Sequence, residues 1–160
     1  MDKKYTDEEY AAQLPRKIVG SAVLFFNQAG ELLIVKPDYK DGWLVPGGSA
    51  DENESPLHSA LRETKEEIGL DVTELKLVGV HYGHRKGYYT DSLKFIYLGG
   101  VLTPAQISAI HLQTEELEEL KFLPPEIAIP LFTASLRQCV PACLAAIQNN
   151  TVAYTESGVA

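Results

Sequence analysis

Five charged side chains lie close together in the stretch GSADENESPLHSALRETKEEIGL, positions 48–70, and their types and spacing suit metal chemistry. They are Glu54, Arg62, Glu63, Glu66 and Glu67. On a helix the last three would be neighbours, because residues three and four positions apart share a face, and like charges there repel by roughly 0.2–0.5 kcal/mol per pair. A divalent cation would turn that repulsion into attraction, since Mg²⁺ prefers carboxylate oxygens.

The local sequence predicts that these glutamates do lie on a helix, from about residue 56 to residue 68. Ser55 is a suitable N-cap, a proline follows it, and Gly69 is a natural stop. At about 100° per residue, one arc of the helix is expected to be buried, and it comprises Leu57, Ala60, Leu61, Thr64 and Ile68. The glutamates occupy the neighbouring arc, at the edge of the core. For the glutamates alone, an ordinary solvated face with ion pairs to Arg62 and Lys65 is the alternative interpretation.

Apolar and β-branched runs predict the strands that would position this helix. The first two are joined by the turn NQAG and predict a hairpin. The expected strands cover residues 17–26, 31–36, 74–82, 92–98 and 120–123. A short helix is expected at 103–110, and more helix in the C-terminal segment, where Pro130 and Pro141 must start, kink or divide it. Strands that bracket one central helix indicate an α/β layered domain.

Composition sets limits on the class of protein. The chain has 160 residues, 45% of them hydrophobic and 22% charged, which is typical of one globular domain. We expect a polar arm at 1–16, a domain at 17–150 and a tail at 151–160. The net charge of −8 argues against broad binding to nucleic acid or to anionic membranes. No run has the length of a signal peptide core or a membrane span, which predicts a soluble, cytoplasmic protein.

The full spacing of the charged stretch resembles the Nudix box, Gx5Ex7REUxEExGU, in which U is a bulky aliphatic residue. The only departure is Thr64 at a U position, where a β-branched residue still packs. The matching residues are Gly48, Glu54, Arg62, Glu63, Glu66, Glu67, Gly69 and Leu70. Wider similarity, from GSAVLFF through WLVPGG to LKFLPPE, covers roughly residues 17–126. The resemblance implies an α/β Nudix fold, in which a mixed β-sheet is sandwiched between α-helices.

The resemblance also implies a reaction. Nudix hydrolases cleave the diphosphate of a nucleoside diphosphate linked to another moiety X, giving a nucleoside monophosphate and phosphorylated X, with Mg²⁺ or Mn²⁺. By this resemblance Glu63, Glu66 and Glu67 hold the metal, joined by the carbonyl of Gly47 or Gly48. Metal ions neutralise a diphosphate and acidify a bound water.

The remaining box residues and the general base are assigned more loosely. Arg62 is expected to pair with Glu54 and hold the carboxylates in place. For the base we favour Glu66, which is also a metal ligand, and then Glu116 and Glu119 from the run TEELEEL. Glu115 and Glu118 belong to the same run, and a plain solvated acidic turn is the alternative interpretation of it.

Four residues outside the box are candidates for substrate binding: Trp43, His84, Arg85 and Tyr89. Trp43 could stack on a base or simply pack at the edge of the sheet. The loop GHRKGYYTD, with His81 before it, could meet phosphates or remain solvated.

The identity of X stays open, and so does a homodimer, since no residue defines an interface. A Nudix-fold module that binds a nucleotide without cleaving it, and a metal-dependent isomerase, are the alternative functions. Cys139 and Cys143, one helical turn apart, are expected to be buried thiols.

Overall fold

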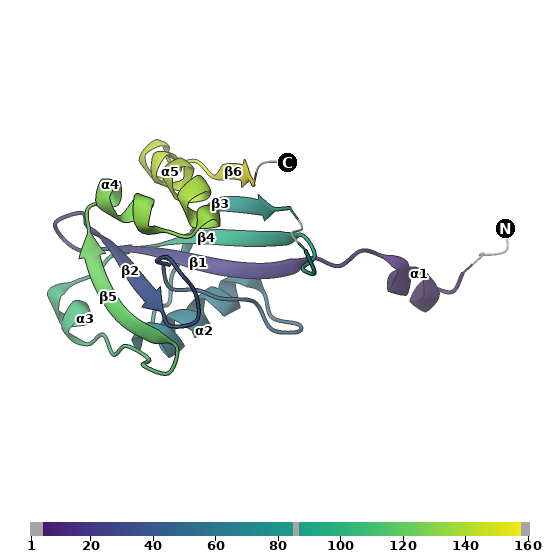
Figure 1. The fold of residues 1–160 in the computed structure, drawn as a ribbon, viewed down its shortest axis with the longest axis horizontal. Helices are drawn as coiled ribbons and strands as arrows, with labels where there is room; N and C mark the ends of the chain where they lie inside the picture. The colour runs from purple at the N-terminus through teal and green to yellow at the C-terminus, as the bar shows by residue number, and fades with distance from the viewer. Residues whose placement is uncertain (1–4, 85–86, 158–160) are drawn as a thin grey trace.

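A mixed six-stranded sheet forms the centre of the molecule (Figure 1). The computed structural model describes residues 5–84 and 87–157. The strand order is β5-β2-β1-β4-β3-β6; β1 pairs in parallel with β4 and β3 with β6, and the other neighbours are antiparallel. The strands are β1 (Ile18–Phe26), β2 (Leu32–Pro37), β3 (Lys76–Gly83), β4 (Ser92–Val101), β5 (Leu117–Leu123) and β6 (Ala153–Glu156).

Helices cover both faces of this sheet. The helix α2 (Pro56–Ile68) packs on β1, and α5 (Ala134–Asn149) packs on β3 and β6 from the opposite side, as Figure 1 shows. The predicted mixed sheet between helices is therefore confirmed. The other helices are α1 (Asp7–Gln13), α3 (Pro104–Ser108), α4 (Pro125–Ala128) and the 3-10 turn η1 (Ile129–Leu131).

Several elements differ from the sequence-based expectation. The strand β5 begins at Leu117, three residues early, so Glu118 and Glu119 lie in a strand rather than in a turn before it. Pro141 lies inside α5 without ending it, whereas Pro130 lies in η1, before α5 begins. Short elements occupy both segments for which no regular structure was predicted: α1 in the polar arm and β6 in the tail.

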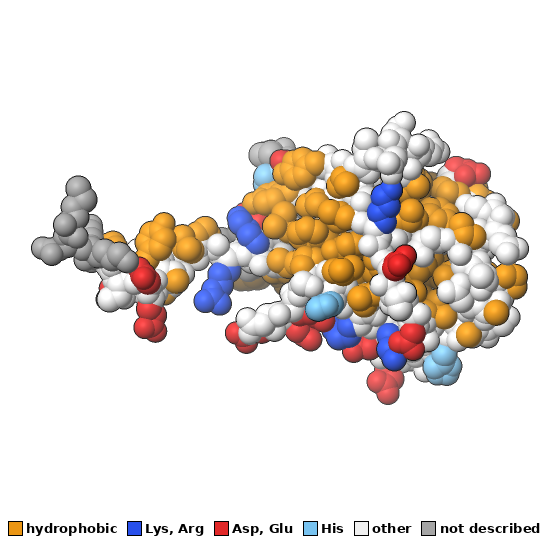
Figure 2. All heavy atoms as spheres, turned by 180° about the vertical axis from the view of Figure 1, so that it is seen from behind, with side chains coloured by type: hydrophobic (Ala, Val, Ile, Leu, Met, Phe, Trp, Pro, Cys, Tyr) orange, Lys and Arg blue, Asp and Glu red, His pale blue; other side chains and the backbone are white. Residues whose placement is uncertain are grey.

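The N-terminal arm that carries α1 stands away from the body (Figures 1 and 2). No residue of α1 is buried, and its stability comes from a capping box between Thr6 and Glu9. Seen from behind, apolar side chains gather over the sheet region while charged ones line the lower edge, the side on which α2 lies (Figure 2). Within the described part of the chain, no helix combines the length and apolarity needed to cross a membrane.

The local sequence explains the ends of α2. The hydroxyl of Ser55 accepts a hydrogen bond from the amide of His58 at 3.2 Å, and Gly69 ends the helix in the left-handed region, with φ of 73°. Thr64 is fully buried, as expected, and its hydroxyl donates to the Ala60 carbonyl at 2.7 Å. Both ends and the central threonine therefore follow the predicted pattern.

The buried face of α2 is turned further toward the glutamates than the helical periodicity predicted. Leu57, expected inside, is 40% exposed, while Ser59 and Glu67 are buried. The physical reason is the small size of Ser59 and Ala60, which lets the helix approach β1 closely. The Ser59 and Ser21 hydroxyl oxygens are 3.1 Å apart across this contact.

The turn before the helix is held by hydrogen bonds to β1 and to a side chain of α2. The Gly48 carbonyl accepts from the Ser21 amide at 2.8 Å, and the Gly47 amide donates to the Glu67 carboxylate at 2.8 Å. Gly47 has φ of 147°, and a Cβ built on it would lie 2.2 Å from the Ser21 carbonyl oxygen. Only glycine fits here without displacing the β1 backbone.

We expect Gly47→Ala to destabilise the fold far more than Gly30→Ala. Both glycines have positive φ, which costs an alanine about 1–3 kcal/mol, but Gly30 has open space around it and Gly47 does not. Urea denaturation followed by circular dichroism measures both losses of unfolding free energy. Equal losses would show that the contact with Ser21 imposes no cost of its own.

Candidate active site

Arg62 lies at the centre of the charged cluster. Its guanidinium binds both Glu54 oxygens, with Nε and Nη2 each 2.9 Å away, and Nη2 also reaches the Ser49 carbonyl at 3.1 Å. Its Nη1 is shared between Glu63 at 2.9 Å and Glu66 at 3.0 Å. The Arg62 hydrogen bonds and the Asp51 amide lower the pKa of Glu54 to about 2. Arg62 thus ties the loop before α2 to the helix.

Glu67 is the most enclosed carboxylate of the cluster, with only 8% of its surface exposed. Burial is the main reason that its pKa is raised to about 8, and the charges of Glu63 and Glu116 act in the same direction. The Gly47 amide and the charge of Lys40 oppose this rise. Burial likewise raises the pKa of Glu63, although Arg62 offsets part of the effect. Negative charges therefore converge here from two separate segments.

The segment after α3 brings Glu116 to this place. The Gln113 amide donates to the Glu67 carbonyl at 2.9 Å, and the Asp38 amide donates to the Glu116 carbonyl at 3.0 Å, which fix the segment between α2 and the loop after β2. Glu119 does not join the cluster. It lies in β5 opposite Lys36 of β2, and its carboxylate pairs with Lys121 at 2.7 Å.

The chemistry of this donor set fits a hard divalent ion, although its present arrangement does not chelate one. Among the described residues, no three His, Cys, Asp or Glu side chains are grouped closely enough to hold a metal, because Glu63 and Glu66 turn toward Arg62. Releasing those two contacts would leave Arg62 anchored by both Glu54 oxygens. Carboxylates freed in this way next to buried Glu67 are the oxygen ligands that Mg²⁺ and Mn²⁺ take.

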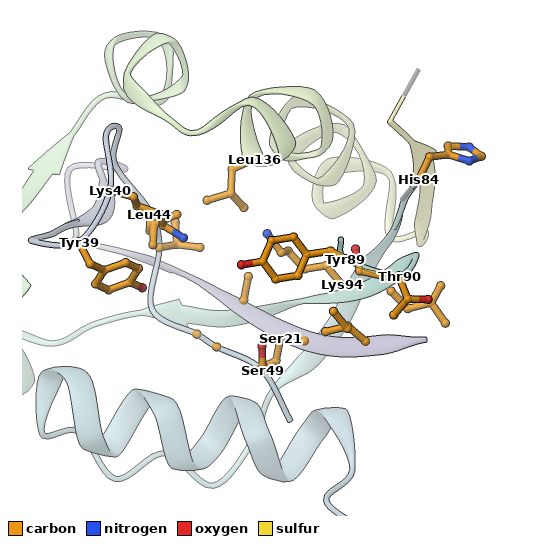
Figure 3. A pocket seen from close by; sticks show the side chains of 18 residues that line it. Ser21, Tyr39, Lys40, Leu44, Ser49, His84, Tyr89, Thr90, Lys94 and Leu136 are labelled. Atoms are coloured by element: carbon orange, nitrogen blue, oxygen red, sulfur yellow. The ribbon is translucent and has the colours of Figure 1, made fainter. Parts of the chain in front are cut away.

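A cavity of about 550 Å³ adjoins the cluster and runs over β1 and β4 to Leu136 of α5 (Figure 3). This size suits a small-molecule ligand. Gly47, Gly48 and Ser49 line the end next to the box. The lining residues that the sequence did not predict include Tyr39, Lys40 and Lys94. Of these, only Lys94 had a visible signal, as a lysine in the middle of the apolar strand SLKFIYL.

The predicted substrate-binding residues have different surroundings. Tyr89 and His84 both line the cavity, but Tyr89 lies over it in Figure 3, whereas the His84 ring points away from it. The His84 ring lies edge-on to Tyr82, and its Nε2 is 3.2 Å from Glu156. Arg85 falls outside the described residues.

Neither Trp43 nor His81 is among the described residues that line this cavity. Trp43 packs against the core below Lys121, whose Nζ is 4.9 Å from the indole ring centroid. This is the edge packing that was weighed against base stacking. His81 is buried in β3, with Nδ1 2.9 Å from the Thr155 hydroxyl.

Comparison with known proteins identifies relatives of this chain. The NUDIX domain family profile matches residues 16–143. An uncharacterized Nudix hydrolase of Pseudomonas aeruginosa is 30% identical over 118 residues, which is 69% of this chain and 64% of that protein. An RNA pyrophosphohydrolase of Hydrogenovibrio crunogenus is 37% identical over 57 residues, which is 36% of this chain and 34% of that protein.

Among solved structures, the MutT protein of Methanosarcina mazei has a TM-score of 0.68 at 19% identity, over 86% of this chain and 99% of that one. At this identity the likeness shows the fold alone. The chain spans between about a third and just under two thirds of the length of the curated relatives named above. The fold, the box and the profile together define a class, and the chain belongs to the Nudix hydrolase family.

The buried Glu67 should make the metal-free protein less stable as pH rises. In the folded state Glu67 keeps its proton up to about pH 8, whereas an unperturbed carboxyl loses it near 4.5. The folded state therefore holds more protons in this window, and the unfolding free energy should fall by up to about 1.4 kcal/mol per pH unit. Glu63 acts in the same direction.

Urea denaturation in chelator, across this pH window, measures the effect. We expect Glu67→Gln, which still accepts from the Gly47 amide, to reduce the slope of the unfolding free energy against pH. Lys65→Met, on the exposed side of α2, serves as a control and should keep it. A wild-type slope in Glu67→Gln would show that Glu67 is not the group responsible.

Proposed function

We propose that this chain hydrolyses the diphosphate linkage of a nucleoside diphosphate joined to a moiety X, using Mg²⁺ or Mn²⁺. The products are a nucleoside monophosphate and phosphorylated X. The observation that carries the proposal is the convergence of Glu63, Glu67 and Glu116 beside Gly47 and Gly48, which line a cavity large enough for a nucleotide derivative. Such a cluster is electrostatically unfavourable alone and becomes favourable with a cation.

Each box residue has a distinct role in this proposal. Glu63, Glu66 and Glu67 hold the metal, with the carbonyl of Gly47 or Gly48 as a further oxygen ligand. A bound divalent ion supplies neutralisation of the diphosphate charge and acidification of a water. The Gly47 amide holds the Glu67 carboxylate in one orientation, and Arg62 keeps the Glu54 loop in place against the helix.

Glu116 is our choice for the base that takes the proton from the attacking water. Its charge raises the pKa of both Glu63 and Glu67, so it lies near them. Because Glu116 comes from a segment outside the box and is not one of the proposed metal ligands, it is free to accept a proton. Glu66 is 57% exposed at its side chain and lies on the outer side of the cluster, which suits a ligand more than a base. Glu119 faces Lys121 and has no role in this proposal.

The alternative is a Nudix-fold module that binds a nucleotide without cleaving it. The ion pairs of Arg62 with Glu63 and Glu66 favour it, because they neutralise two of the three candidate ligands. A panel of nucleotide sugars, dinucleoside polyphosphates, ADP-ribose and oxidised nucleoside triphosphates, incubated with Mg²⁺, Mn²⁺ or chelator, separates the two functions. Phosphate released after a coupling phosphatase reports hydrolysis. Nucleotide binding without any turnover would favour the module.

Glu66→Gln and Glu67→Gln should each abolish metal-dependent turnover, by at least about 100-fold, because each removes a charged ligand from the ion. Circular dichroism should show an intact fold, since neither change leaves an ion pair partner buried. Turnover near the wild-type rate in both variants would sink the metal-site assignment.

Glu116→Gln should lower kcat by about 10²–10⁴-fold with little change in KM, as expected when a general base is lost. Glu119→Gln, from the same acidic run, is the matched control and should keep the wild-type kcat. If the two variants are equally active, Glu116 is not the base.

A further inference from the structure

Lys94 is a cation on the β4 side of the cavity. It lies in the middle of β4, where its neighbours in the sheet are Gly20 of β1 and His81 of β3. Gly20 and Lys94 both line the cavity, and a Cβ built on Gly20 would lie 3.1 Å from the Gly48 carbonyl oxygen, so the turn before α2 is close to this part of the sheet. Figure 3 shows Lys94 on one side of the cavity and Lys40 on the other.

The Lys94 ammonium has almost no partner of its own. Its one hydrogen bond within the described residues is to the Ser135 hydroxyl, at a long 3.5 Å, and no carboxylate there forms an ion pair with it. Burial is the main reason that its pKa is lowered; Cys139 opposes this shift, and the charge of Lys40 adds to it. Lys40 is also without an ion pair among the described residues. Two ammonium groups thus face one cavity; the Glu67 carboxylate acts on Lys40, whereas no carboxylate of the described residues pairs with Lys94.

A second orphaned polar atom lies beside Lys94 in the sheet. His81, its cross-strand partner, has Nε2 buried without a hydrogen-bond partner in the described part of the chain. An unpaired ammonium and an unpaired imidazole nitrogen at one place are costly to bury. A bound anion would accept hydrogen bonds from Lys94 and offset that cost, whereas a neutral group would leave the charge unbalanced.

We infer that the Lys94 end of the cavity binds a second anionic group of the substrate, a phosphate or carboxylate carried remotely from the diphosphate. The inference rests on the proposed function, since it takes the diphosphate to lie at Glu63 and Glu67. One end of an elongated substrate, the diphosphate, would lie at the acidic cluster together with its metal ion. The other end would carry an anion to the Lys94 ammonium, so Lys94 would determine specificity. Compounds with a neutral group at this position would bind less tightly.

The test uses pairs of compounds that differ only in the remote anion. NADP⁺ and NAD⁺ differ in a phosphate, and UDP-glucuronate and UDP-glucose differ in a carboxylate. Binding is measured calorimetrically in chelator, so that nothing is hydrolysed. We expect the anionic member of at least one pair to bind about tenfold or more tightly, the effect of one charge-assisted contact. The pair that shows the preference identifies phosphate or carboxylate as the anion.

Lys94→Met should remove the preference, and Lys94→Arg should keep most of it. Since methionine replaces an uncompensated buried charge, Lys94→Met should also melt at a higher temperature than the wild type, which a misfolded variant would not do. Lys76→Met, an exposed lysine of the neighbouring strand β3, is the control and should bind like the wild type.

Any of three results would overturn the inference. They are equal affinity within both pairs in the wild type, no measurable binding of either anionic compound, and a preference that survives in Lys94→Met. Turnover with Mg²⁺ is assayed on the same samples to separate the two proposals. Hydrolysis without anion preference defeats only the role of Lys94. Anion preference without hydrolysis of any compound defeats only the proposed reaction.

Discussion

The burial of the Glu67 carboxylate is the constraint on which the site depends. It is possible because Ser59 and Ala60 bring α2 close to β1, and because Gly47 places a backbone amide against the carboxylate in a conformation that other residues resist. Fold and site are therefore one arrangement: the same contact seats the helix and orients its charge. The carboxylate stays destabilising until a proton or a cation neutralises it.

Arg62 explains how three glutamates can share one helical face in the absence of an ion. One guanidinium binds Glu54 with two nitrogens and shares its third with Glu63 and Glu66, so part of the repulsion is cancelled within the cluster. The division matters because the Glu54 contacts are bidentate and the others are single. The single contact of the exposed Glu66 is weak enough to be exchanged for a metal, and the more enclosed Glu63 is likewise held by one contact only. The tie to Glu54 can persist throughout.

The sequence predicted what depends on local pattern and spacing. The box, the ends of α2 and the principal strands are encoded by caps and by periodicity, and these features were found where they were expected. The difference between Glu116 and Glu119 was not readable, because it arises from backbone contacts of the 109–116 segment with α2. The orientation of His84 depends on β6, a strand in a tail with no clear pattern of its own. Long-range pairing decided both.

The distribution of charge in the cavity follows from the same long-range pairing. The chain carries a net charge of −8, yet Lys40 and Lys94 come together only because β2 and β4 lie on either side of β1. Surface charges farther away than about 8 Å are largely screened at physiological ionic strength. An anionic ligand inside the cavity would therefore respond mainly to these two lysines and, under the proposed function, to an ion held by the glutamates. A strongly acidic protein can in this way offer a site to a polyanionic substrate.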